Sequence, residues 1–184
     1  MVKILSEKSG VLLKFMTAIA LTAAAVLFPQ LVHLVGTWSH TGNALGTIIL
    51  PMHFAVLLSG LILGPVAGGM IGAASPLISY LLTGMPSADQ VFLMCVELAV
   101  YGISSGLISQ KKIPVSLKIL IAQILGRAVK LFVAAVLSLV LTDIAFSVGS
   151  FAMTFLKGIP GMILQLCLIP VLFYNMKGFA KYYE

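Results

Sequence analysis

The sequence predicts an all-α membrane protein, a compact bundle of six transmembrane helices with its N- and C-termini in the cytoplasm. Hydrophobic residues make up 60% of the chain and charged residues only 9%, whereas soluble domains carry about 25% charged residues. The mean hydropathy is +1.15. A chain of 184 residues exposes much of its surface, and here the charges are too few to cover it. Lipid is therefore the expected solvent.

Six apolar runs approach the length of about 20 residues that spans a bilayer. They cover approximately residues 11–35, 48–63, 66–82, 91–108, 119–141 and 151–174. Gly64-Pro65 predicts a tight turn between the second and third runs. Residues 83–86 end the third run, and residues 110–116, with two lysines and a proline, end the fourth. With no long polar linker, residues 1–184 are expected to form one integral-membrane domain.

The start of the sixth span is less well defined. Gly158, Pro160 and Gly161 could mark its first turn, because these residues interrupt helices. Residues 143–157 would then form an outer loop or a half-buried hairpin. The alternative is a helix that already starts near residue 151.

The positive charges predict the orientation. Three clusters of lysine lie before the first span, between the fourth and fifth, and after the sixth: Lys3, Lys8 and Lys14; Lys111, Lys112 and Lys118; Lys177 and Lys181. With six spans, all three clusters fall on one side of the membrane. The loops on the other side, residues 36–47, 83–90 and 142–150, contain no Lys or Arg. The positive-inside rule then places both termini in the cytoplasm.

Several function classes are disfavoured. The net charge of +6 lies in short clusters between apolar runs, without the aromatic and basic face that nucleic acid requires. Cys95 and Cys167 both lie inside apolar runs and are expected to be inert thiols. The three histidines share no helical metal-ligand spacing, and no catalytic motif is present. Neither an enzyme nor a bound cofactor is expected.

The first outer loop, residues 36–47, reads GTWSHTGNALGT. It is longer and more polar than a minimal turn, so it is either a solvated connector or a lid over an outward-facing pocket. Trp38, Asn43, Tyr80 and Tyr101 lie at suitable depths to complete such a pocket, although interfacial anchoring or helix packing explains each of them equally well.

Five ionisable residues fall inside or at the ends of apolar spans, where burial is expensive and a functional role is the default interpretation. They are His53, Glu97, Arg127, Lys130 and Lys157. Glu97 either forms a structural ion pair with Arg127 or Lys130, or contacts a ligand. Three cations face one carboxylate, so positive charge remains in excess. This excess favours a pocket for a ligand that bears a carboxylate.

Small residues are spaced for close helix packing. Ala20 and Ala24 share a helix face, and Gly60, Gly64, Gly68 and Gly72 repeat every four residues across the Gly-Pro turn. Such faces serve either internal packing or a partner subunit. Spacing alone favours internal packing.

Together these features resemble the substrate-binding S component of an energy-coupling factor (ECF) transporter. The resemblance rests on six short spans, the Ala20-xxx-Ala24 motif, the polar loop that follows it, the run LPMHFAVLLSGLILGPVAGGMIGAASPLISYLLTGMP from Leu50 to Pro86, and ELAVYGISSGL from Glu97 onward.

The resemblance implies high-affinity binding of a vitamin-like micronutrient at the membrane of a prokaryotic cell. It implies partnership with a transmembrane coupling subunit and two ATPases, and toppling of the binder within the bilayer. It assigns Ala20 and Ala24 to the coupling interface, against the preference from spacing. It places substrate contacts in the regions of Trp38, His40 and Asn43 on the first loop, and of Glu97, Tyr101, Lys130 and Lys157 on later spans.

Two other functions remain open from the residues alone. One is a stand-alone permease or channel, which needs a continuous polar path or internal repeats around a midplane site. The other is a structural membrane protein whose charges only pair internally. The identity of the ligand is also open, because neutral pyrimidine, pyridoxine-like or deazapurine molecules compete with a carboxylate such as pantothenate.

Overall fold

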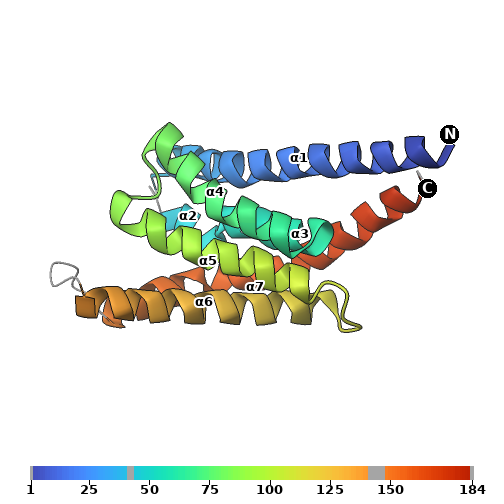
Figure 1. Cartoon of the computed structure of the whole chain (residues 1–184). Helices are drawn as coiled ribbons and strands as arrows, with labels where there is room; N and C mark the ends of the chain where they lie inside the picture. Colours follow the sequence, from blue (N-terminus) through green and yellow to red (C-terminus); the bar gives the residue numbers. More distant parts are fainter. Residues whose placement is uncertain (1, 41–43, 141–147, 183–184) are drawn as a thin grey trace.

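The computed structural model describes residues 2–40, 44–140 and 148–182, and the side chains of residues 11–40, 44–139 and 153–175. Within this part, the chain is entirely helical apart from short connections (Figure 1). The helices are α1 (Val2–Trp38), α2 (Ala44–Ile49), α3 (Pro51–Leu63), α4 (Pro65–Thr83), α5 (Ala88–Leu107), α6 (Val115–Val140) and α7 (Val148–Tyr182).

Among the described residues, six segments are long and apolar enough to cross a membrane, as the sequence predicts. The short α2 and α3 together form one of them, Ala44–Leu63. The start of α1 and the end of α7 lie at the same end of the bundle, and so does the connection between α5 and α6 (Figure 1). All three lysine clusters therefore belong to this end, which we call the terminal end. The side of the membrane that it faces remains a prediction.

Two glycines make the tight connections possible. Gly64 separates α3 from α4 with a φ of 92°, and Gly84 ends α4 with a φ of 70°. Only glycine adopts such angles without strain. Pro65 then starts α4, where its missing N–H is no loss. The predicted Gly64-Pro65 turn and the break after Thr83 are both confirmed.

Backbones approach closely where α3, α4 and α5 meet, and the pairing of α4 with α5 is the most extensive in the fold. A Cβ at Gly102 would lie 2.0 Å from the carbonyl oxygen of Gly68, and one at Gly72 would lie 2.2 Å from that of Leu98. Gly60 faces the backbone of Gly102 in the same way. These glycines serve internal packing. In lipid, helices associate largely through such close packing, because burial of apolar side chains away from lipid gives no hydrophobic gain.

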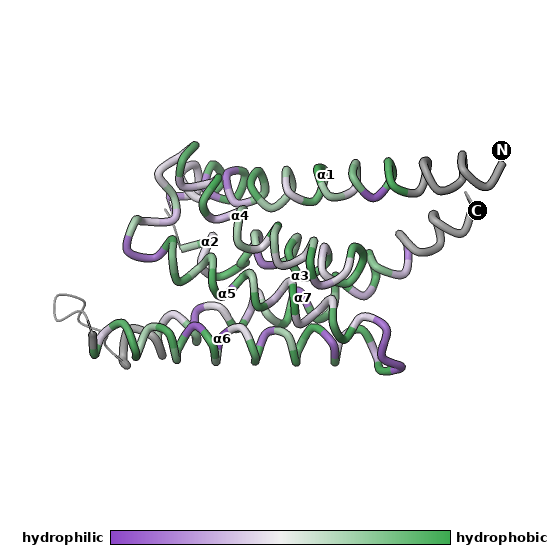
Figure 2. The backbone as a smooth tube through the Cα atoms, viewed as in Figure 1, coloured by the Kyte–Doolittle hydropathy of each residue, from purple (hydrophilic) through white to green (hydrophobic). Residues whose placement is uncertain are grey.

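The core and the outer surface have the same apolar character. Val56, Leu57, Leu98, Ile119 and Ile169 are fully buried between the helices. Outward-facing residues are also large and apolar, such as Leu139 at 84% exposed and Val66 at 75%. Figure 2 shows mostly hydrophobic residues along the helices and hydrophilic residues at the connections between α4 and α5 and between α5 and α6. This is the distribution expected of a protein in lipid.

The structure corrects one expectation and decides between two alternatives. Residues 36–47 do not form one irregular loop, because α1 continues to Trp38 and α2 begins at Ala44; residues 41–43 lie outside the described part. For the sixth span, the alternative of a helix that already starts near residue 151 is confirmed, because α7 begins at Val148 and runs through Gly158, Pro160 and Gly161. The glycines instead provide room for neighbours: a Cβ at Gly161 would lie 2.3 Å from the carbonyl oxygen of Ile48.

The glycine packing yields a first prediction. Gly72→Ala should destabilise the purified protein by about 1–3 kcal/mol, because its methyl group meets the α5 backbone, which cannot rotate away. Ala73→Val adds two methyl groups at the next, exposed position and should leave the thermal midpoint in detergent unchanged. Equal midpoints for the two variants would show that the α4–α5 approach is not close.

Candidate functional site

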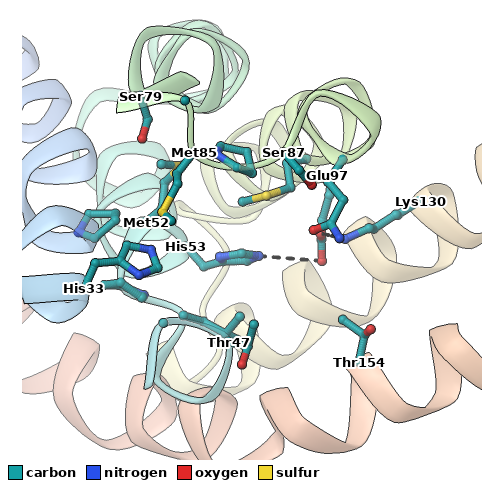
Figure 3. A pocket seen from close by; sticks show the side chains of 18 of the residues that line it. His33, Thr47, Met52, His53, Ser79, Met85, Ser87, Glu97, Lys130 and Thr154 are labelled. Atoms are coloured by element: carbon teal, nitrogen blue, oxygen red, sulfur yellow. Dashed lines mark hydrogen bonds and ion pairs between the residues drawn. The ribbon is translucent and has the colours of Figure 1, made fainter. Parts of the chain in front are cut away.

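A cavity of about 400 Å³ lies at the end of the bundle opposite the terminal end. Every helix contributes to its wall, together with the connection between α4 and α5 (Figure 3). The lining residues are Pro29, His33, Gly46, Thr47, Leu50, Pro51, Met52, His53, Ser79, Gly84, Met85, Pro86, Ser87, Gln90, Met94, Glu97, Arg127, Lys130 and Thr154. The volume and the mixture of apolar walls with a few polar groups are typical of small-molecule sites.

Glu97 of α5 is the centre of a buried ionic cluster. It is 1% exposed, and the Nζ of Lys130 on α6 donates to its Oε2 at 2.7 Å. The Tyr101 hydroxyl donates to Oε1 at 3.2 Å, and the Nε2 of His53 on α3 lies 3.7 Å from the same oxygen. Figure 3 shows His53 and Lys130 reaching Glu97 from two sides. Three helices are thereby tied together at the cavity wall.

Helix geometry explains this convergence. Glu97 and Tyr101 are four residues apart and so lie on one face of α5. Gly126 of α6 faces that same surface, where a Cβ would lie 2.0 Å from Cδ1 of Tyr101. The close approach of α5 and α6 at Gly126 lets the side chain of Lys130, one turn further along α6, reach the carboxylate.

Arg127 lies in a different environment from Lys130. It is 8% exposed, and its guanidinium carbon lies 5.1 Å from the centre of the Phe155 ring on α7, a cation–π distance. A Cβ at Gly158 would lie 2.8 Å from Nη2, so this glycine makes room for the guanidinium. Among the described residues, no carboxylate lies within 4.0 Å of Arg127, whereas Glu97 pairs with Lys130 and His53.

Two buried amides join α6, α7 and the junction of α2 with α3. Gln123, one turn before Arg127 on α6, donates to Oε1 of Gln165 on α7 at 2.8 Å. Gln165 in turn donates to the carbonyl oxygen of Leu50 at 3.1 Å. Leu50 lines the cavity in a left-handed conformation, with φ 53° and ψ 52°, which is strained for leucine. The amide chain holds this strained corner in place.

The structure brings together four of the predicted site residues, since His53, Glu97, Arg127 and Lys130 all line the cavity. The structural alternative for Glu97, an ion pair with Lys130, is present. Tyr101 supports Glu97 from behind without lining the cavity.

The other predicted residues are placed elsewhere or are not described. Trp38 is 79% exposed at the end of α1. His40 and Lys157 are also exposed, and neither they nor Tyr80 line the cavity. Asn43 lies outside the described residues. Trp38 is held away by the continuation of α1, and the lining comes instead from Gly46 and Thr47 of α2.

Sequence reasoning missed several participants. His33 lines the cavity from α1, and Met52, Met85 and Met94 supply flexible apolar surface. Gln123 and Gln165 had a visible signal, because uncharged amides in the middle of apolar spans need partners as charges do. Gln123 also shares a helix face with Arg127 by its spacing of four residues.

The amide chain yields a second prediction. Gln165→Leu should destabilise the protein by about 1–3 kcal/mol, because it leaves the buried Gln123 amide without a partner. Gln123→Leu with Gln165→Leu should recover most of that loss, since no amide is then left unpaired. Thermal unfolding of the two single variants and the double variant provides the measurement. If the loss of stability in the double variant equalled the sum of the losses in the two single variants, the two amides would not interact.

Comparison with known proteins agrees with the geometry. Residues 11–178 match the family model described as "ECF transporter, substrate-specific component". No curated protein and no solved structure matches the chain significantly. The family match spans most of the chain and includes every residue that lines the cavity. The chain therefore belongs to the substrate-specific components of ECF transporters, which are membrane-embedded binding subunits for transport.

Proposed function

We propose that the cavity around Glu97 is the binding site for a water-soluble micronutrient, most simply a vitamin-like molecule with an anionic group. The observation that carries this proposal is a 400 Å³ cavity whose wall includes a buried carboxylate and two cations. Ionisable side chains inside a membrane bundle are expensive, by about 2.5–3.5 kcal/mol each on insertion scales. Such groups are retained where they serve a ligand or a partner.

The arrangement favours a binding subunit over a stand-alone permease or channel. The polar lining gathers toward the end opposite the terminal end. Beyond the cavity, the core contains the fully buried Leu57, Ile119 and Ile169. The buried Ser59 and Ser105 in the same core donate to carbonyl oxygens of their own helices, so their hydroxyls are already used. A permeation path needs polar groups along its whole length, and the apolar core opposes one. A binder that releases its ligand elsewhere in a transport cycle needs only one closed site.

The transport cycle that we propose depends on partners. The chain works with a transmembrane coupling subunit and two cytoplasmic ATPases in the plasma membrane of a prokaryote, with the cavity facing outward before transport. It carries the cavity across by toppling in the bilayer. The outer surface of the described helices is largely apolar, with Lys14 and Lys157 as exposed charges near the ends of their spans. This supports toppling, because many exposed charged side chains would resist passage through lipid. Ala20 of α1 is exposed and available to a partner helix, while Ala24 packs partly against the core.

The binding site is tested by filling it. Met94→Trp places an indole in the cavity and should weaken retention of the co-purifying small molecule at least about tenfold, or about 1.4 kcal/mol. Phe92→Trp is the matched control, because Phe92 is 54% exposed on the same helix and does not line the cavity. Native mass spectrometry of both detergent-purified variants measures the bound fraction. Full retention in Met94→Trp would place the ligand elsewhere.

The partner interface is tested separately. Ala20→Trp should abolish co-purification with the coupling subunit and the ATPases when all are co-expressed, because a bulky ring prevents close helix contact. Phe15→Trp, at an exposed position on another face of α1, should leave the complex intact. Small-molecule retention should be equal in both variants. An intact complex with Ala20→Trp would remove Ala20 from the interface.

A further inference from the structure

Two cations on α6 lie three residues apart, yet their surroundings differ. Lys130 forms a 2.7 Å ion pair with Glu97, which also receives the Tyr101 hydroxyl. Arg127 has no described carboxylate within 4.0 Å, and its Nε has no hydrogen-bond partner among the described residues. One cation thus has a resident anion, and the other does not.

The charges of the lining do not cancel. Glu97 contributes −1, while Lys130 and Arg127 contribute +1 each, so these three residues leave the wall at +1. The cavity also contains His33 and His53, which add no negative charge. A positive charge enclosed by apolar helices without a counter-ion is unfavourable. An anionic ligand group that enters the cavity would remove this imbalance.

Arg127 is nevertheless held in a defined position. The Phe155 ring lies 5.1 Å from its guanidinium carbon, and Gly158 leaves space beside Nη2. The residue lines the cavity while being only 8% exposed. A guanidinium that is held between an aromatic ring and a helix backbone is pre-organised, so less side-chain entropy is lost when an anion binds.

We infer that the two cations have separate roles: Lys130 is the permanent counter-ion of Glu97, and Arg127 binds the anionic group of the substrate. The ligand class is a small organic monocarboxylate. A guanidinium pairs bidentately with a carboxylate, and one negative charge cancels the surplus, whereas a phosphate brings about −1.5 to −2 charges. Met52, Met85 and Met94 then contact the uncharged part of the ligand. This inference rests on the proposed function.

The stability of the ligand-free protein tests the division of roles without any probe. Lys130→Gln should lower the thermal midpoint in detergent, because it leaves Glu97 buried without its counter-ion. Glu97→Gln combined with Lys130→Gln should restore the midpoint. Arg127→Gln should leave the midpoint unchanged or raise it, because it removes an uncompensated charge. If Arg127→Gln lowers the midpoint as Lys130→Gln does, and Glu97→Gln rescues it, Arg127 is a structural counter-ion and the inference fails.

Matched probe pairs test the ligand class. We would measure thermal stabilisation by pantothenate and panthenol, nicotinate and nicotinamide, and biotin and biotinamide, in which only the acid of each pair is charged. We expect stabilisation of the wild-type chain by an acid and not by its neutral partner, and at least about a tenfold weaker response in Arg127→Gln. Equal stabilisation by both members of a pair, or an undiminished response in Arg127→Gln, would overturn the inference.

The same experiments can contradict the proposed function without contradicting the separate roles of Arg127 and Lys130. A wild-type chain that retains no small molecule from cells and responds to none of the six probes contradicts micronutrient binding at this cavity. The midpoints of the Arg127 and Lys130 variants still decide whether the two cations have different roles. A neutral molecule that is retained in the cavity supports the binding function and overturns the assignment of Arg127.

Discussion

A carboxylate inside a bilayer has to be neutralised by the protein itself, because the surrounding lipid offers neither water nor counter-ions. In this chain Glu97 imposes that requirement on three helices. Lys130 of α6, His53 of α3 and Tyr101 of α5 all surround its two oxygens. Removal of any one partner leaves a buried charge less well compensated, so the cluster fixes how these helices meet.

The glycine contacts and the ionic cluster depend on each other. Gly72 and Gly102 bring α4 and α5 to backbone contact, and Gly126 lets α6 approach Tyr101. The Gly126 contact sets the distance at which Lys130 of α6 can reach Glu97 of α5. The amide chain from Gln123 through Gln165 to Leu50 then fixes the opposite wall, where α2 meets α3. The site is thus built on rigid helices, while its apolar surface comes from flexible methionines.

Much of this fold follows from one-dimensional patterns. The six spans, the Gly64-Pro65 turn and the grouping of lysines at one end depend on runs of apolar residues and on local breakers, which can be read directly from the sequence. Glu97, Arg127 and Lys130 also pointed to the cavity wall from the sequence. Ionisable side chains are costly inside a membrane, so their presence in apolar spans indicates a functional site.

The remaining features depend on which side chains of different helices meet, and the spacing of residues along the sequence does not show this. Sequence spacing does not show whether Lys130 or Arg127 pairs with Glu97, because both cations lie on the same face of α6. Trp38 was predicted from its depth and Lys157 from its charge at an apolar span, and neither signal specifies which side of a helix faces the cavity. Gly158 and Gly161 resemble a helix start in sequence, yet they are tolerated inside α7 because Arg127 and α2 occupy the space that they leave. In each case, the outcome depends on contacts with residues of another helix.

We propose that the cavity bounded by Glu97 holds the transported molecule. An experimental structure of the wild-type chain, purified with the small molecule that it retains from cells, tests this most directly. We expect ligand density between Arg127, Glu97 and Met94, with a carboxylate against the Arg127 guanidinium and the Glu97–Lys130 pair intact. Ligand density at any other place on the chain, with this cavity empty, would contradict it.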